Sequence, residues 1–356
     1  MNTLFVLIIS LIALIYGAEK FIDFCEAFAR KLKISEFTVG LTVVALGTSA
    51  PEIFVGLASV IDGGEDVFTS GYSLATGTVI GSNIANIALI FGIACAFRKK
   101  IPSRDTAKRQ YIPVTFTALA LGYVLFDSKI DLIDSIILFA GLPIFLLVLL
   151  KDKTAQTSLA NETSVVENKI PLIENIFFNI KFLPSSLINL SSHKISHILI
   201  GFFFSLVLIL LGAEYVVSAA QNIAIELNVS TKNVGLVIVA IGTSLPELAA
   251  TIAAIRRTKT DLVIGNVFGS NVMNISLVLP AMGFLNSSYS KSGFEVDPRF
   301  YESDWQIMLF FTVLLLLVVS FLNIVKDEFL LKFIKFFGAI LLTLYVLYIL
   351  KIANII

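Results

Sequence analysis

The side chains best suited to chemistry lie in a six-residue motif that occurs twice. It reads GTSAPE at residues 47–52 and GTSLPE at residues 242–247. Each copy places a carboxylate, two hydroxyls and a helix-breaking proline inside an apolar segment long enough to cross a bilayer. An acidic side chain at that depth is costly in hydrocarbon and marks a functional site. Two acids in matching contexts indicate one site shared by two halves.

A second polar motif follows each of the first. It reads GSNIAN at residues 81–86 and GSNVMN at residues 269–274. In both motifs the polar side chains are four residues apart, so they share one face of a helix. These pairs are Thr48 with Glu52, Thr243 with Glu247, Ser82 with Asn86, and Ser270 with Asn274.

The prolines add backbone oxygens to this set. Pro51 and Pro246 each remove a backbone donor, so we expect carbonyls around residues 45–47 and 240–242 to lose their helix partners. Carboxylate, amide, hydroxyl and carbonyl oxygens suit Ca²⁺ and not Zn²⁺ or Cu⁺. Two carboxylates match one divalent charge, and the same oxygens could hold Na⁺ ions instead. Competition between two ions for shared ligands is a sufficient basis for antiport.

The composition indicates a membrane protein. The 356 residues are 57% hydrophobic and only 15% charged, with a mean hydropathy of +0.91. Soluble domains carry about 25% charged residues. The net charge is zero, so no nucleic-acid partner is indicated, and nothing implies a protein partner or a cofactor. The apolar N-terminus lacks the basic residues and cleavage site of a signal peptide. Cys25 and Cys95 lie in apolar stretches and are expected to be packed thiols.

The apolar runs predict an all-α polytopic protein with ten spans. A first five-helix half covers residues 1–150 and contains the motif region 40–97. A cytoplasmic linker covers 151–194, and a second five-helix half covers 195–356 with the motif region 235–285. The spans are expected at 3–29, 37–60, 70–97, 110–126, 131–150, 195–225, 233–255, 261–285, 305–324 and 329–350.

The two halves are related by an internal repeat. Residues 17–52 and 212–247 align without gaps and are identical at 16 of 36 positions. Because each half has an odd number of spans, the second half must enter the membrane inverted with respect to the first. Inverted repeats are common in secondary transporters, with the binding site at the repeat interface near the membrane midplane.

The basic residues predict the orientation. With the N-terminus outside, the inner loops and adjoining span ends carry 20 of the 26 Lys and Arg residues. The outer side carries five, and Lys20 lies within the first span. This bias favours both termini outside, in the plasma membrane or, in a bacterium, the inner membrane.

The paired motifs resemble the two alpha-repeats of the sodium/calcium exchanger family, within the wider cation/calcium antiporter group. The resemblance covers roughly residues 15–97 and 210–285 and indicates a prokaryotic-type member without a large regulatory domain. It implies ten spans in two inverted halves and exchange of Ca²⁺ for Na⁺ by alternating access. Matched by position, the implied ion ligands are Glu52, Glu247, Thr48, Ser49, Thr243, Ser244, Asn86, Asn274, Ser82, Ser270, Ala45 and Ala240.

One position departs from part of the family. Potassium-dependent exchangers and some prokaryotic members carry Asp where this chain has Asn274, so the site has two acids instead of three and K⁺ co-transport is disfavoured. A H⁺/Ca²⁺ antiporter that uses the same glutamates is the alternative function, and a cation channel is a further class. An intramembrane hydrolase would need a base near Ser49 or Ser244, and no histidine lies deep in a span, so an enzyme is not expected. Interhelical hydrogen bonding is the alternative role for Asn86 and Asn274.

Overall fold

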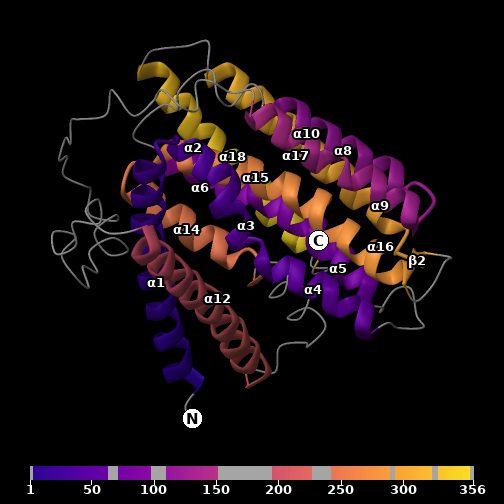
Figure 1. Ribbon diagram of the computed structural model, residues 1–356, viewed down its shortest axis with the longest axis horizontal. Coiled ribbons are helices and arrows are strands. Elements are labelled where there is room, and N and C mark those ends of the chain that lie inside the picture. The colour runs from indigo at the N-terminus through magenta and orange to yellow at the C-terminus, as the bar shows by residue number, and fades with distance from the viewer. Residues whose placement is uncertain are drawn as a thin grey trace.

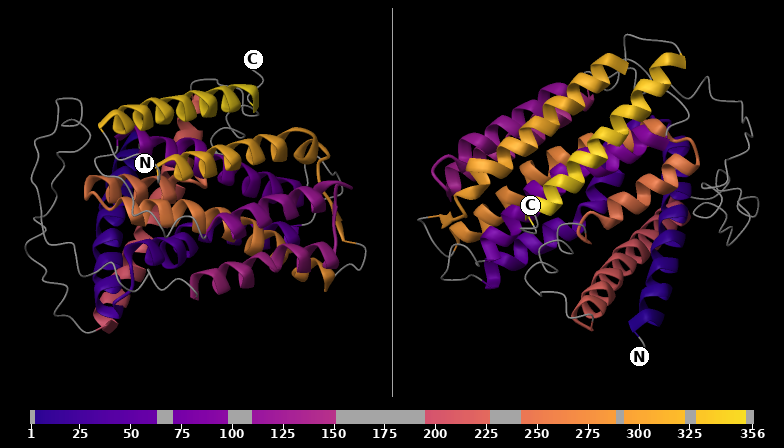
Figure 2. Two further views of the ribbon diagram at one scale, coloured as in Figure 1. Left: turned by 90° about the horizontal axis from the view of Figure 1, so that it is seen from above. Right: turned by 180° about the vertical axis from the view of Figure 1, so that it is seen from behind.

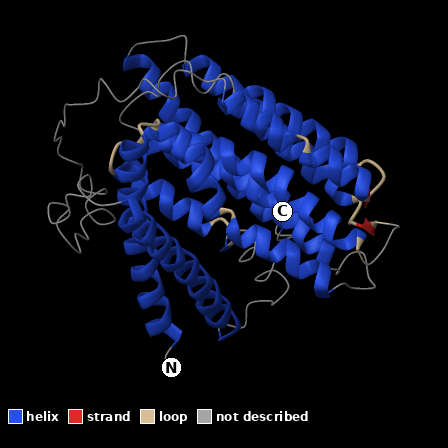
Figure 3. Ribbon diagram, in the orientation of Figure 1, coloured by secondary structure: helices blue, strands red, loops and turns tan. Residues whose placement is uncertain are grey.

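The computed structural model describes residues 3–62, 71–97, 110–150, 195–226, 242–288, 293–322 and 328–352, and these are almost entirely helical (Figures 1 and 3). The first half contains helices α1 (Thr3–Leu32), α2 (Glu36–Val39), α3 (Ala45–Thr48), α4 (Ala50–Asp62), α5 (Gly71–Ala85), α6 (Gly92–Phe97), α8 (Tyr111–Leu125), α9 (Leu132–Phe139) and α10 (Gly141–Leu150). The π-helical turns η1 (Gly40–Val44) and η2 (Asn86–Phe91) join α2 to α3 and α5 to α6.

The described part of the second half is also helical. It contains α12 (Ile195–Glu226), α14 (Leu245–Arg256), α15 (Thr260–Met273), α16 (Leu279–Ser287), α17 (Trp305–Leu322) and α18 (Glu328–Ile352). The π-helical turn η7 (Asn274–Val278) joins α15 to α16, and η8 (Phe300–Asp304) precedes α17. Two short strands, β1 (Lys129–Ile130) and β2 (Phe294–Glu295), pair antiparallel and connect the halves at one end of the molecule (Figure 3).

Eight stretches of the described chain are long and apolar enough to cross a membrane, and they match eight of the ten predicted spans. A ninth prediction corresponds to α8, which is apolar but shorter. The first part of the span predicted at 233–255 lies outside the described residues, as does the linker 151–194. The described chain is therefore a multi-pass helical membrane protein, and the ten-span arrangement stays a prediction.

Two hydrophobic clusters hold the helices together. The larger one includes residues of α4, α5, α8, α15, α16, α17 and α18 from both halves, with Phe91, Phe145 and Phe268 fully buried. The smaller one joins α1 and α12 to α14, with Phe21 and Ile209 at its centre. Helices α1 and α12 lie side by side and extend away from the remaining helices (Figures 1 and 2).

A capping box sets the start of α9, next to the strand pair. The Asp131 carboxylate accepts hydrogen bonds from the backbone N–H groups of Asp134 and Ile133, and the Asp134 carboxylate accepts one from the Asp131 N–H. The bond from the Asp134 N–H is the main reason why the pKa of Asp131 lies below its ordinary value. Such caps are worth about 1 kcal/mol of helix stability.

Candidate cation site

The two proline motifs break their helices in the same way. Ser49 separates α3 from α4 with φ −82° and ψ 8°, and Ser244 precedes α14 with φ −88° and ψ 2°. Each proline is the second residue of the new helix, where its missing N–H costs no helical hydrogen bond. Glu52 and Glu247 therefore lie in the first turn of α4 and α14, where the partial positive charge of the helix N-terminus favours a carboxylate.

The second motifs end in matching irregularities. Asn86 is the first residue of η2 and Asn274 is the first residue of η7, so a π-helical turn begins at the same position of each repeat. Such turns occur mostly inside α-helices and often at functional sites. Both asparagines are fully buried.

Close backbone contact between the halves positions these motifs. A Cβ added to Gly40 would lie 2.2 Å from the carbonyl oxygen of Leu262, and one added to Gly269 would lie 2.1 Å from that of Leu41. Only glycine permits this approach. The turn η1 of the first half is thereby packed directly on α15 of the second, which brings the repeated motifs together.

The two carboxylates are almost completely buried. Glu52 is 1% exposed and Glu247 is 0% exposed. Ser82 donates a hydrogen bond of 3.0 Å to Oε1 of Glu52, and Ser49 donates one of 3.2 Å to Oε1 of Glu247. Because Ser49 belongs to the first half and Glu247 to the second, the structure builds one site from both motifs.

Ser82 is the centre of the polar network. Besides its bond to Glu52, its hydroxyl accepts from Nδ2 of Asn274 at 3.2 Å and lies 3.4 Å from the hydroxyl of Ser244. Nδ2 of Asn274 also donates to Oδ1 of Asn83 at 3.1 Å. The amide nitrogen of Asn274 is thus held by the first half, which leaves its oxygen for another partner.

The hydroxyls of Thr48 and Ser270 both lie near Asn266, a residue that the motif comparison did not select. Oδ1 of Asn266 lies 3.5 Å from the Thr48 hydroxyl and 3.4 Å from the Ser270 hydroxyl, while Thr48 also donates to the Val44 carbonyl at 3.0 Å. Asn83 was missed although it is repeated as Asn271 within the second motif. Asn266 has no such signal, because the matching residue of the first half is Thr78.

Several buried oxygens in this region have no hydrogen-bond partner among the described residues. They belong to both carboxylates, both motif asparagines and one threonine: Glu52 Oε2, Glu247 Oε2, Asn86 Oδ1, Asn274 Oδ1 and Thr243 Oγ1. Buried polar atoms are nearly always satisfied, so such a group requires an explanation. Hard oxygen atoms without a proton donor are suitable ligands for Ca²⁺ or Na⁺.

Two predicted positions need separate comment. The Ala45 carbonyl accepts a hydrogen bond of 3.0 Å from the Ser49 N–H, so the expectation that this carbonyl has lost its helix partner is wrong. The break at Ser49 comes one turn later, and Ala45 stays a candidate only through its second lone pair. Ala240 lies outside the described residues.

Neither carboxylate forms an ion pair with a cationic side chain of the residues that the structure describes. Within the described parts of the chain, every Lys or Arg ion pair involves other acids, at Asp23, Glu19, Glu26, Glu36 and Asp297. Two buried charges without such a partner are strongly destabilising. Buried carboxylates of this kind are suited to bind a cation or to take up a proton.

Comparison with known proteins identifies the family. The sequence pattern of the family described as sodium/calcium exchanger protein matches residues 2–151 and 197–352. The chain belongs to this family. It is a membrane transporter, not an enzyme.

Two curated relatives match nearly end to end. The inner membrane protein YrbG of Escherichia coli is 28% identical over 312 residues, which are 88% of this chain and 87% of that protein. The sodium/calcium exchanger MaX1 of Methanosarcina acetivorans is 29% identical over 339 residues, 88% of this chain and 90% of the relative.

The fold has solved counterparts. A structure of the sodium-calcium exchanger NCX_Mj, soaked with 2.5 mM Na⁺ and 1 mM Sr²⁺, superimposes with a TM-score of 0.72. The match covers 98% of both chains at 24% identity, so it establishes a shared fold. Another NCX_Mj structure, soaked with 2.5 mM Na⁺ and 0.1 mM Sr²⁺, has a TM-score of 0.69 at 26% identity.

Proposed function

We propose that this protein is an antiporter that exchanges Ca²⁺ for Na⁺ across the membrane by alternating access. Glu52 and Glu247 bind Ca²⁺ in competition with Na⁺. The observation that carries this proposal is the pair of buried carboxylates, each with one oxygen lacking a partner and neither paired with Lys or Arg in the described chain. Two negative charges match one Ca²⁺.

The remaining ligands are the uncharged oxygens around the carboxylates. They are the hydroxyls of Thr48, Ser49, Thr243, Ser244, Ser82 and Ser270, the amide oxygens of Asn86 and Asn274, and the carbonyls of Ala45 and Ala240. Ca²⁺ takes about six to eight oxygen ligands, and a flexible set of this kind can serve either ion. A hydroxyl can direct its lone pairs to the ion when its proton is donated to another acceptor. Ser270 has such an acceptor in the amide oxygen of Asn266.

Alternating access follows from the inverted repeat. The site draws ligands from both halves, so a change in how the halves pack exposes the same ligands to the other side. We propose ten spans, both termini outside and the segment 151–194 in the cytoplasm, because basic residues concentrate on the inner side in that orientation.

Transport in proteoliposomes tests the exchange. Uptake of radioactive Ca²⁺ is compared between vesicles loaded with Na⁺ and vesicles loaded with K⁺ or choline at matched pH. We expect uptake only with internal Na⁺. Equal uptake in all three would indicate a channel or uniporter. Uptake that needs a pH gradient in Na⁺-free medium would indicate a H⁺/Ca²⁺ antiporter, in which protons neutralise the same two glutamates.

Charge-removing variants test the assignment of the site. We expect Glu52→Gln and Glu247→Gln each to abolish exchange, because one carboxylate cannot compensate a divalent ion. The matched control is Glu214→Gln, which changes an exposed glutamate within α12 and should retain transport. Normal Ca²⁺ transport by either site variant would remove the carboxylates from the mechanism.

A further inference from the structure

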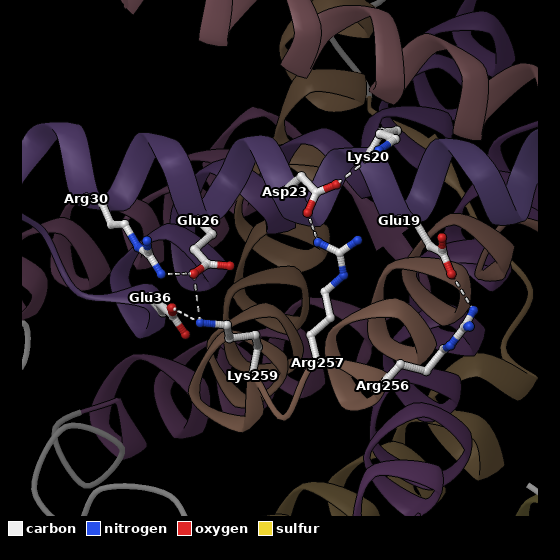
Figure 4. Close-up of polar contacts among 9 residues, drawn as sticks. All are labelled: Glu19, Lys20, Asp23, Glu26, Arg30, Glu36, Arg256, Arg257 and Lys259. Atoms are coloured by element: carbon white, nitrogen blue, oxygen red, sulfur yellow. Dashed lines mark hydrogen bonds and ion pairs between the residues drawn. The ribbon is translucent and has the colours of Figure 1, made fainter. Parts of the chain in front are cut away.

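A row of ion pairs ties α1 to the turn between α14 and α15 (Figure 4). Arg256 pairs with Glu19 and Arg257 pairs with Asp23. Lys259 lies 3.1 Å from Glu26 of α1 and 2.7 Å from Glu36 of α2. We call these contacts the α1 latch.

The latch is partly shielded from solvent. The side chains of Glu19, Asp23, Arg256 and Arg257 are only 17–25% exposed, and Lys259 is 18% exposed. Lys20 and Arg30 flank the row on α1 and pair with Asp23 and Glu26. Partly buried pairs that form a network contribute more than isolated pairs on an open surface.

In the sequence, the acidic residues of this latch are only partly repeated in the second half. Glu19 corresponds to Glu214 of α12, but Asp23 and Glu26 correspond to Ser218 and Gln221. Glu214 is exposed and forms no ion pair with any residue that the structure describes.

The matching connection of the first half has the opposite charge. The end of α4 and its connection to α5, residues 61–70, contain three acids, Asp62, Glu65 and Asp66, and no Lys or Arg. A glutamate of α12 brought to this segment would meet negative charge instead of positive charge.

An inverted repeat can exchange the packings of its two halves. In the second conformation, α12 would approach the connection between α4 and α5 as α1 now approaches the connection between α14 and α15. Because α14 carries Glu247, the position of α1 against its end is coupled to the cation site. The α1–α12 pair packs in the smaller hydrophobic cluster, which also includes residues of α14.

We propose that the α1 latch makes the exchanger asymmetric, by favouring the observed packing over its inverted counterpart. The apparent affinity for Ca²⁺ is then better at the membrane face to which this packing opens than at the other. This inference rests on the proposed exchange function and adds a residue-level cause for unequal affinities. Its ligand is the same Ca²⁺, and its determinants lie outside the cation site.

The test measures the apparent KM for Ca²⁺ at each face. Proteoliposomes with a single insertion orientation are assayed for Na⁺-driven Ca²⁺ transport in both directions, with wild type and with the double variant Glu19→Gln, Asp23→Asn. Apparent affinity scales with the fraction of protein in the competent conformation. Removing two such pairs should bring the ratio of the two KM values closer to one, and we expect the ratio to change on the order of tenfold.

Two further variants separate the latch from general damage. Glu214→Gln is the repeat-matched comparison and should change the ratio much less than the double variant, because it removes no ion pair among the described residues. The charge exchange Glu19→Arg with Arg256→Glu restores the pair with reversed polarity and should bring the ratio back toward the wild-type value. It also tests the proposal if the double variant does not fold.

Three outcomes would overturn the latch: an unchanged ratio in the double variant, a parallel change of KM at both faces, or an equal effect of Glu214→Gln. Each of these leaves exchange itself intact. Failure of the wild type to exchange Ca²⁺ for Na⁺ would instead refute the proposed function.

Discussion

Ser82 and Ser270 occupy equivalent places in the two repeats, yet their partners differ in charge. Ser82 donates to the Glu52 carboxylate at 3.0 Å, whereas Ser270 donates to the neutral amide oxygen of Asn266 at 3.4 Å. A hydrogen bond to a charged group is worth about 1.5–3 kcal/mol, and a neutral one about 0.5–1.5 kcal/mol. Ser82→Ala also removes the acceptor for Asn274.

These values predict unequal losses of affinity. Since about 1.4 kcal/mol corresponds to a factor of ten, Ser82→Ala should weaken the apparent Ca²⁺ affinity by roughly 10- to 150-fold. Ser270→Ala should weaken it by roughly 2- to 10-fold on the same scale. The assay is the KM for Ca²⁺ in Na⁺-loaded proteoliposomes, supported by the Ca²⁺-dependent shift of the unfolding temperature in detergent.

The control is Ser205→Ala, a buried serine of α12 that donates only to the Phe202 carbonyl in the described structure. It should leave the KM for Ca²⁺ near the wild-type value. Ser82→Thr keeps the hydroxyl and should retain most of the affinity. Equal losses in Ser82→Ala and Ser270→Ala, or a larger loss in the latter, would refute the argument from the charge of the partner.

Three further predictions follow from other contacts. Gly269→Ala should lower the free energy of unfolding by about 1–3 kcal/mol or prevent folding, because its Cβ meets backbone at 2.1 Å. Gly92→Ala should cost less in the same thermal unfolding assay, because its Cβ comes no closer than 3.2 Å to atoms of Leu341 and Leu342. Asn83→Ala should raise the KM for Ca²⁺ about fivefold, because the Asn274 amide loses one acceptor, and an unchanged KM would contradict this role. Asp131→Ala should cost about 1 kcal/mol at neutral pH. The pKa of Asp131 is lowered because the backbone N–H groups bind its ionised form. The contribution to stability is therefore present above the unfolded pKa of about 3.9 and is lost as the pH falls through the lower pKa of the folded state. The melting curves of the variant and the wild type should accordingly converge in acid.

The sequence predicted the membrane class and selected two glutamates that the structure buries, because both features have strong signals. Apolar runs separated by polar loops define spans, and eight of them are found as long apolar helices. Glu52 and Glu247 are unusual in such runs and occur twice, so composition and repetition both identify them. The structure places both in buried positions at breaks in their helices.

The partners of these residues were less predictable. A linear motif does not show that Ser49 donates a hydrogen bond to Glu247 in the other half. It also does not show that the amide oxygen of Asn266 lies within hydrogen-bond distance of the hydroxyls of Thr48 and Ser270. These contacts depend on how η1 packs on α15, which is a tertiary property. The α1 latch was not predictable for the same reason. In the sequence, Arg256 and Arg257 are only basic residues near the end of a predicted span.

The π-helical turns that begin at Asn86 and Asn274 have a consequence for the tolerance of the chain to deletions. A π-helical turn is equivalent to an α-helix that carries one extra residue. Deleting one residue within 87–91 or 275–278 would return the segment to a regular α-helix, because the bulge already accommodates the extra residue, and the segments on either side would keep nearly the same relative rotation. The buried face of α6 or α16 would stay in place, and the change would fall on the widened turn next to the motif asparagine. The fold should therefore tolerate single deletions here better than single deletions in the regular part of α6 or α16, which rotate the residues beyond them by about 100°.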